Sequence, residues 1–361
     1  MTKSYKILVT PLNWGLGHAT RCVPIVKALL ELGHNPLVAA DKAPLSFLQK
    51  EFPDIEMIKL PGFEPLYSKG DSQVFKLLSS IPRALMDFKK EHQDVESIVK
   101  EYNIDAVISD NRFGCWSKNV RSVFITHQLH IQTPHFFKWT YPIINMMNAN
   151  YIRHYDELWI PDVEEEPSLS GVLAHPADAG IKTSYIGALS RFDKGRAEED
   201  KDIEYLVILS GPEPQRTILE NIIIRQAPDV EGRVVVLRAK PNQNELPYGI
   251  SDNVVMFNHV DDDFFVELVS KSKNIICRGG YSSLMDLVAL DRNAFLVPTP
   301  GQTEQEYLAD YLTKKGLFNS CKQSDFVLKN VKTPSENVKG YFGEGGYNLN
   351  EFLENWLDTL P

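Results

Sequence analysis

Two glycine-containing turns, far apart in the chain, carry the residue types best suited to chemistry. The first is residues 13–18 (Asn-Trp-Gly-Leu-Gly-His), and the second is residues 277–286 (Cys-Arg-Gly-Gly-Tyr-Ser-Ser-Leu-Met-Asp). Each turn follows a short apolar run and precedes residues with helical spacing. Such strand-to-helix corners direct backbone N–H groups at an anionic ligand. Two corners of this kind, in two halves of the chain, predict one cleft between two domains.

The histidine that ends the first turn is a candidate general base. The amino end of a helix disfavours the charged imidazolium, so we expect the ring of His18 to be neutral and able to accept a proton. Asp110 follows another predicted strand, where its carboxylate could orient that ring and stabilise its charged form. Two plainer interpretations stay open: His18 is a polar cap on an exposed turn, and Asp110 is a strand-end cap.

Alternating strand and helix patterns must position these turns. Apolar runs typical of strands recur at residues 5–10, 37–40, 55–60, 106–109, 123–126, 157–160, 205–209, 234–237, 254–257, 274–277 and 294–297. Helical spacing separates most of them, as in residues 19–32 and 84–101. The alternation predicts an α/β protein whose sheets are mostly parallel and covered by helices on both faces.

Length predicts two domains, because 361 residues exceed what one hydrophobic core usually organises. We assign residues 1–189 to the first domain and residues 203–339 to the second. The segment between them, residues 190–202, is charged and poor in apolar residues, so we interpret it as a linker. Residues 340–361 are expected to form a tail that ends in a helix.

The composition is that of a folded protein without a basic face. Hydrophobic residues make up 43% and charged residues 24% of the chain, and the formal net charge is -10. These values argue against disorder and against a nucleic-acid partner. Cys22, Cys115, Cys277 and Cys321 form no paired ligand set and are expected as free thiols. Because we find no signal peptide and no apolar stretch long enough to span a membrane, we expect a cytoplasmic protein.

Two cofactor hypotheses fit the sequence less well. A dinucleotide fingerprint requires a third glycine or alanine where this chain has Thr20, although Asp41 resembles the ribose-binding acid of that motif. A metal site is suggested by several imidazoles close together, but their spacing fits no structural zinc set, and no carboxylate or cysteine completes it. The residues concerned in that second hypothesis are His127, Gln128, His130 and His135.

Residues 136–147 are rich in aromatic residues and methionine. One hypothesis is an exposed apolar face for a lipid or a hydrophobic acceptor, with peripheral contact to the inner face of a membrane. The alternative is an ordinary buried helix.

Three segments, in the same order, resemble the GT-B glycosyltransferases, in particular the MurG-like enzymes of family 28. The glycine loop at residues 15–18 is similar to their N-terminal loop. Residues 258–262 and 274–286 are similar to their nucleotide-binding stretch, and residues 297–306 to the segment that contacts the donor sugar. The resemblance spans roughly residues 5–320. It implies two Rossmann-like parallel-sheet domains that face one cleft.

Taken position by position, the resemblance implies that the second domain binds the donor. The backbone at Val260 would contact the nucleobase, and Asp286 would accept hydrogen bonds from the ribose hydroxyls. Gln305 would bind the sugar. The remaining donor-side positions implied are Gly17, Ser210, Gly211, Arg216, Arg278, Gly279, Gly280, Ser282, Ser283 and Gln302, and the acceptor-side positions are His127 and Gln128.

Several of these assignments have plainer alternatives. Asp286 is shorter than the glutamate usual at its place, so a surface helical aspartate stays open. Gly279 and Gly280 could serve close packing of helix on strand alone. The acidic residues Glu304 and Glu306, with Gln302, could form a solvated first helical turn.

The resemblance implies an inverting transfer of a hexose or N-acetylhexosamine from a nucleotide diphosphate, with UDP favoured, to an acceptor hydroxyl. No metal or cofactor is implied. The acceptor would be a small molecule, a glycan or a lipid-linked sugar, as in cell-envelope or glycoconjugate synthesis. Two other functions remain open: a C2 epimerase acting on nucleotide sugars, and a non-catalytic nucleotide-sugar binding protein.

Overall fold

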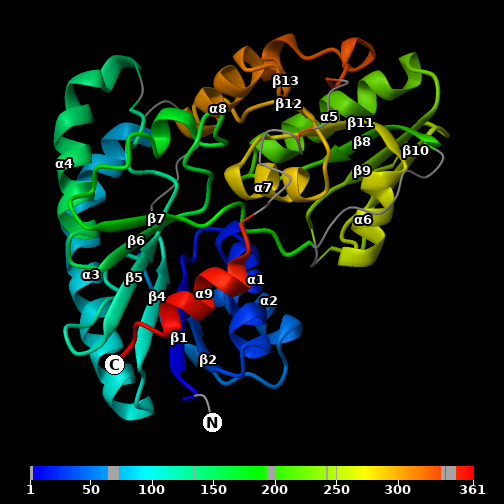
Figure 1. The fold of residues 1–361 in the computed structure, drawn as a ribbon. Coiled ribbons are helices and arrows are strands. Elements are labelled where there is room, and N and C mark those ends of the chain that lie inside the picture. Colours follow the sequence, from blue (N-terminus) through cyan, green and yellow to red (C-terminus); the bar gives the residue numbers. More distant parts are fainter. Residues whose placement is uncertain are drawn as a thin grey trace.

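The computed structural model contains two parallel sheets, one in each half of the chain (Figure 1). It describes residues 3–63, 73–133, 135–192, 201–240, 243–248, 250–334, 338 and 347–361. Within these residues, the first sheet has seven strands in the order β3-β2-β1-β4-β5-β6-β7, and the second has six in the order β10-β9-β8-β11-β12-β13. The predicted α/β class, with a parallel sheet in each half, is confirmed.

The first sheet is built from strands that alternate with helices. The strands are β1 (Lys6–Pro11), β2 (Asn35–Ala40), β3 (Met57–Lys59), β4 (Ala106–Asp110), β5 (Arg121–Ile125), β6 (Glu157–Ile160) and β7 (Lys182–Tyr185). The helices are α1 (Gly17–Glu31), α2 (Lys42–Glu51), α3 (Gln73–Tyr102) and α4 (Tyr141–Ile152), and α4 is preceded by the 3₁₀ turn η1 (His135–Thr140). The sequence patterns did not predict β7, because this edge strand is short and polar.

The second sheet follows the same scheme. Its strands are β8 (Ile203–Ile208), β9 (Arg233–Leu237), β10 (Val254–Phe257), β11 (Ser272–Cys277), β12 (Phe295–Leu296) and β13 (Asn319–Ser320). Its helices are α5 (Gln215–Gln226), α6 (Asp262–Ser270), α7 (Tyr281–Ala289) and α8 (Thr303–Lys314). The short 3₁₀ turns are η2 (Gly171–Leu173) in the first half and η3 (Ala227–Asp229), η4 (Gln323–Asp325) and η5 (Leu328–Asn330) in the second. A strand of two residues such as β13 gives no sequence pattern to detect.

The last helix, α9 (Leu349–Leu357), returns to the first domain, where Figure 1 shows it beside α1. Trp356 packs edge-on against the buried Trp159 of β6, with ring centroids 5.0 Å apart. The hydroxyl of Tyr5 donates to the carbonyl of Leu360 at 3.2 Å. The predicted terminal helix therefore completes the core of the domain that begins the chain. Most of the proposed linker, residues 193–200, and the start of the proposed tail, residues 340–346, lie outside the described residues.

The two domains touch along α7 and α8 of the second domain. The Tyr281 hydroxyl donates to the carbonyl of Pro161 at 2.9 Å, and the Tyr311 hydroxyl donates to the carbonyl of Ser168 at 3.1 Å. The Thr303 hydroxyl reaches the carbonyl of Gln132 at 3.0 Å. The carboxyl end of a parallel strand is where α/β proteins place ligands, and β4 and β5 end near this interface. We therefore expect the ligand-binding site at this interface.

Candidate active site

The two glycine turns meet across the domain interface. Gly17 is the first residue of α1, and the Ser282 hydroxyl at the start of α7 donates to its carbonyl at 3.0 Å. A Cβ added at Gly17 would lie 2.9 Å from the Ser282 oxygen, so a larger residue would push the domains apart at this point. The predicted juxtaposition of the two turns is therefore present.

His18 and Asp110 form the pair that the sequence suggested. His18 is the second residue of α1, and its Nδ1 lies 3.1 Å from an oxygen of Asp110 at the end of β4. Burial and the adjacent Arg21 lower the pKa of His18, so its ring is neutral near pH 7. Burial alone would raise the pKa of Asp110, but Arg21 and His18 lower it to about 2, so its carboxylate is charged. A charged carboxylate beside a neutral imidazole is the arrangement of a general base and its orienting group.

Arg21 lies between these two residues and was missed by sequence reasoning. Its side chain is buried, and its Nε donates to Asp110 Oδ2 at 2.5 Å while its Nη2 donates to Oδ1. The same Nη2 lies 2.9 Å from His18 Nδ1. The signal that could have found it is helical spacing, because a residue three places after His18 shares its face of the helix.

His127 extends this cluster to the second domain. The ring follows β5, lies with its Nδ1 3.3 Å from Arg21 Nη1, and stacks on the ring of Tyr281 with centroids 3.8 Å apart. Its Nε2 lies 2.9 Å from a carboxylate oxygen of Glu304 in the first turn of α8, and Gln128 Nε2 donates to the other oxygen. The candidate acceptor-side residues His127 and Gln128 therefore contact the second domain through one carboxylate.

Glu304 lies in the first turn of α8 but is only partly solvated, with 26% of its side chain exposed. Although burial opposes its ionisation, the hydrogen bond from His127 lowers the pKa of Glu304. Its neighbours differ: Gln302 and Glu306 are exposed, and Glu306 accepts a hydrogen bond from the backbone of Gly301 at 2.9 Å. The sequence spacing could not distinguish the three residues, because Glu304 is partly covered only by its contacts with His127 and Gln128 of the first domain.

The second glycine turn leads directly into the amino end of α7. Gly279 has φ +74°, a conformation that favours glycine, and Gly280 is the N-cap of α7. Ser282 and Ser283 are in the first turn of α7, where backbone N–H groups are free of helical partners. The Gln305 side chain is buried, and its oxygen accepts from the backbone of Thr299 at 2.9 Å. A Cβ at Gly280 would lie 3.9 Å from Gln305 Nε2, so the amide nitrogen of Gln305 lies close to the turn.

Asp286 and Val260 occupy the same domain. The Ser190 hydroxyl donates to Asp286 Oδ1 at 2.7 Å, and burial raises the pKa of this carboxyl to about 7. A ribose hydroxyl at Asp286 would therefore replace Ser190. Val260 is half-buried and packs against the edge of the large core that joins the two domains.

The loop after β8 is placed beside the loop that leads to α8. Gly211 has φ +89°, and a Cβ added there would lie 3.5 Å from the hydroxyl of Thr299. Ser210 precedes it at the carboxyl end of β8. The guanidinium of Arg216 pairs with Glu213 at 2.7 Å and donates to the carbonyl of Ala239 at 2.7 Å. As a phosphate partner, Arg216 would have to leave Glu213.

The Arg278 side chain is not at the donor surface, contrary to the contact suggested for it. It is fully buried and donates to the carbonyls of Val297 and Gln215 at 3.2 and 2.5 Å and to Gln323 at 2.6 Å. Burial lowers its pKa to about 10. Its long side chain points into the domain, where it supplies the hydrogen-bond donors for these buried carbonyl oxygens. Arg278 therefore holds loops together beneath the turn.

The metal hypothesis gains no site in the described residues. Among them, no group of three or more His, Cys, Asp or Glu side chains is arranged to hold a metal ion. His130 Nε2 instead lies 3.0 Å from the carbonyl oxygen of Pro176. The side chain of His135 is not among those that the structure describes. In the described part of the chain, no helix combines the length and apolarity needed to cross a bilayer.

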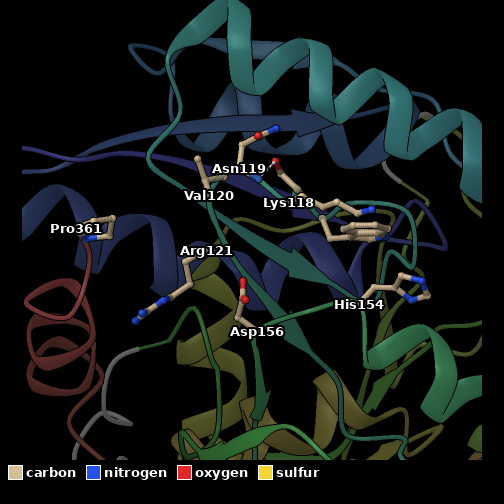
Figure 2. A pocket seen from close by; sticks show the side chains of 9 residues that line it. Lys118, Asn119, Val120, Arg121, His154, Asp156 and Pro361 are labelled. Atoms are coloured by element: carbon tan, nitrogen blue, oxygen red, sulfur yellow. Dashed lines mark hydrogen bonds between the residues drawn. The ribbon is translucent and has the colours of Figure 1, made fainter.

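A pocket opens at the opposite edge of the first sheet (Figure 2). Arg121 begins β5 and Asp156 precedes β6, so the pocket lies at the amino ends of these strands. Trp116, which also lines it, stacks on His92 with ring centroids 3.8 Å apart. Ligands of open α/β sheets bind beyond the carboxyl ends. This pocket is therefore separate from the candidate active site.

The 3₁₀ turn η1 and the helix α4 that follows it expose an apolar face, as one of the two sequence hypotheses expected. The exposed fractions of Trp139, Ile143 and Met146 are 68%, 51% and 59%. On the neighbouring α3, Met86 is 73% exposed, and contact between the two helices is made by Phe88 and Tyr151. The alternative of a buried interior helix is wrong for these residues.

Comparison with known proteins agrees with this architecture. Residues 5–159 match the glycosyl transferase family 1 model, and residues 231–334 match the glycosyltransferase family 28 C-terminal domain. An uncharacterized glycosyltransferase of Methanosarcina mazei is 23% identical over 329 residues, which cover 86% of this chain and 84% of that protein.

Solved glycosyltransferases share the whole fold. The glycosyltransferase SnogD from Streptomyces nogalater aligns with a TM-score of 0.65 at 14% identity, covering 99% of both chains. MurG of Acinetobacter baumannii aligns with a TM-score of 0.54 at 13% identity, covering 98% of this chain and 91% of that one. The chain is a glycosyltransferase with the GT-B fold, and residues 231–334 of its second domain match the glycosyltransferase family 28 C-terminal domain.

Proposed function

We propose that this glycosyltransferase moves a hexose or N-acetylhexosamine from a nucleotide diphosphate, with UDP favoured, to an acceptor hydroxyl with inversion. The observation that carries the proposal is the placement of His18. Its ring, oriented by Asp110, stands at the start of α1, and the start of α7 contacts α1 through Ser282 and Gly17. A base and an anion-binding helix end thus face one another across the interface.

The reaction needs one proton acceptor and one stabilised leaving group. In the tautomer of His18 that donates Nδ1–H to Asp110, Nε2 is free to take the proton of the acceptor hydroxyl. The hydroxyl oxygen then attacks the anomeric carbon as the bond to the diphosphate breaks, and a single displacement inverts the configuration. The leaving diphosphate carries the released negative charge, which the free N–H groups of α7 are placed to stabilise. We propose that this helix end serves in place of a metal ion.

Removal of the Asp286 carboxylate is expected to weaken donor binding by about 1.5–3 kcal/mol, the range for a hydrogen bond to a charged group. Calorimetric titration of Asp286→Ala with UDP measures this, and TDP, GDP, ADP and NAD test the choice of nucleotide. The carboxylate accepts best when ionised. Because the pKa of Asp286 is raised to about 7, we expect the wild-type advantage over the variant to grow between pH 6 and 8.

The control for this titration is Asp310→Ala, which removes an exposed carboxylate paired with Lys314 on α8. It should bind UDP as the wild type does. Equal UDP affinity in Asp286→Ala and the wild type at pH 8 would rule out the ribose contact.

Two other functions are compatible with this fold, and their reaction products distinguish them from glycosyl transfer. A C2 epimerase would convert the nucleotide sugar without an acceptor, and a binding protein would convert nothing. Incubation of candidate UDP-sugars with and without an acceptor library, followed by mass spectrometry and anomeric analysis by NMR, distinguishes all three. We expect acceptor-dependent product of inverted configuration.

The exposed apolar face favours a lipid-linked acceptor at a membrane surface. Trp139, Ile143 and Met146 point outward, and the cationic residues Lys138 and Arg153 are exposed beside them. Apolar side chains flanked by cations suit an anionic lipid surface. The free thiols agree with a reducing compartment, so we place the enzyme in the cytoplasm, against the inner face of a membrane.

Vesicle sedimentation tests this surface. We expect binding to vesicles with anionic lipid, and a loss of at least severalfold in Met146→Glu, since a charge replaces an inserted side chain. Tyr248→Glu is the matched control, because Tyr248 is 96% exposed on the second domain. Equal sedimentation of Met146→Glu and the wild type would contradict the membrane contact.

A further inference from the structure

The carboxylate of Asp41 is nearly buried and has few partners. Asp41 directly follows β2, and only 7% of its surface is exposed. Although it is the N-cap of α2, its side chain makes no capping hydrogen bond. Within the described residues its ionic neighbour is Lys59, whose Nζ lies 3.9 Å away on a side chain that is 72% exposed. Buried carboxylates ordinarily accept hydrogen bonds, so one that accepts none from the described part of the chain points to a donor on a ligand.

Asn13 lies beside this carboxylate, at the end of the neighbouring strand. It follows β1, which pairs with β2, and its Oδ1 accepts from the backbone N–H of Asp41 at 3.1 Å. This bond assigns Oδ1 as the amide oxygen, so Nδ2 carries two N–H donors. Among the residues that the structure describes, Nδ2 has no hydrogen-bond partner. Acceptor oxygens of Asp41 and donor groups of Asn13 are therefore available side by side.

The ring of Trp14 is held in place and is still exposed. Its Nε1 donates to the carbonyl of Phe63 at 2.7 Å, and its ring is tilted against the Phe63 ring with centroids 5.9 Å apart. With its polar edge satisfied, 39% of Trp14 faces solvent. An apolar ring beside available donors and acceptors suits a sugar, because a pyranose has an apolar C–H face and a rim of hydroxyl groups.

These residues lie on the path to the candidate base. Asp41 follows β2 and Asp110 ends β4, and these two strands flank β1. Neighbouring strands are about 4.8 Å apart, so the flanking strands are separated by about 10 Å, roughly the width of one hexose with its hydroxyl groups. The loop from β1 to α1 carries Asn13 and Trp14 and leads to His18. All of them belong to the carboxyl edge of the first sheet, where open α/β sheets bind ligands.

We propose that Asp41, Asn13 and Trp14 form the acceptor subsite, and that the acceptor presents a sugar to it. One hydroxyl of that sugar lies at His18 for transfer. Other hydroxyls donate to the Asp41 carboxylate and accept from Asn13 Nδ2, and an apolar face of the ring rests on Trp14. This inference rests on the proposed transfer at His18. It narrows the acceptor to a glycoside, either free or linked to a lipid.

Saturation-transfer difference NMR tests the subsite with defined probes. The probes are the methyl and octyl glycosides of glucose, galactose, mannose and N-acetylglucosamine, each added to the full chain with saturating UDP. We expect transfer to the ring protons of at least one of these glycosides. Asp41→Asn should weaken its binding about tenfold or more, because a neutral amide replaces a charged acceptor. Trp14→Ala should weaken it at least about threefold, since the apolar contact is lost. The Kd for UDP should stay unchanged in both variants.

The controls are Asp54→Asn and Trp139→Ala. Asp54 is exposed just before β3, at the opposite edge of the sheet, and Trp139 is exposed on η1. Both variants should bind the glycoside as the wild type does. Because the Asp41 side chain caps no helix, Asp41→Asn should also keep the wild-type melting temperature. Loss of glycoside binding together with a lower melting temperature would mean that Asp41 is structural and would overturn the inference.

Other results would also overturn it. These are the absence of transfer to any ring proton in the wild type, transfer confined to the octyl chain, and unchanged glycoside binding in Asp41→Asn. Binding of NAD that disappears in Asp41→Asn would assign the carboxylate to a dinucleotide ribose instead. Failure of the wild type to bind UDP, or full activity of His18→Ala, would refute the proposed function, so the two failures are distinguishable.

Discussion

Replacement of His18 with alanine is expected to lower kcat by about 10²–10⁴-fold, the usual contribution of a general base. Donor binding should change little, because His18 belongs to the first domain and its nearest partners are Asp110 and Arg21. The measurement is a steady-state assay at saturating donor, combined with calorimetric titration of UDP. A large loss of kcat with an unchanged Kd for UDP would separate the chemical step from donor binding.

The control for His18 is another accessible histidine. His154 is exposed at the opposite edge of the first sheet, where it lines the separate pocket (Figure 2), so His154→Ala should retain the wild-type kcat. Asp110→Asn is expected to lower kcat too, since the amide no longer fixes Nδ1–H on His18. Undiminished transfer by His18→Ala would show that another group accepts the proton.

Replacement of Glu91 with alanine is expected to cost about 3–5 kcal/mol of stability, the range for breaking a buried ion pair. Glu91 of α3 is buried, and its Oε1 accepts from Nε of the buried Arg112 at 2.7 Å. Its other oxygen accepts from the backbone of Gly114 at 2.9 Å. The variant leaves a charged guanidinium and a backbone N–H without these partners. Urea unfolding followed by circular dichroism measures the change in the free energy of unfolding.

The comparison for Glu91 is an exposed pair of the same domain. Lys27 and Glu51 lie 3.1 Å apart with half of the lysine side chain exposed, so Glu51→Ala should cost no more than about 1 kcal/mol. Arg112 also donates to the carbonyls of Leu60 and Pro61, beyond β3. A loss below about 1 kcal/mol in Glu91→Ala would mean that water replaces the carboxylate at this site.

Much of the fold follows from local patterns in the sequence. Apolar runs of strand type predicted β1, β4, β5 and β11, because a central parallel strand is covered on both faces and must be apolar throughout. The glycine turns predicted the starts of α1 and α7, because φ +74° at Gly279 and the close approach at Gly17 each demand a residue without a side chain. The edge strand β7 was missed because a polar edge strand has no such signature.

The candidate active site, like the fold, could be predicted only in part from the sequence. The sequence identified His18 and Asp110 by residue type and by position at the ends of predicted elements. It did not identify Arg21, and it suggested a solvated place for Glu304, which is only partly solvated. Both differences have one cause: helical spacing tells which residues share a face, but only packing tells which of them is covered by a partner from a distant part of the chain.

By itself the sequence determined the elements, their order and the residue types at the two turns, because backbone conformation and burial pattern are local consequences of side-chain size and polarity. Only the tertiary structure decided that α9 returns to the first domain, that Arg278 points inward, and that Glu304 meets His127. These contacts join residues far apart in the chain, where orientation and desolvation are fixed by how the two domains pack.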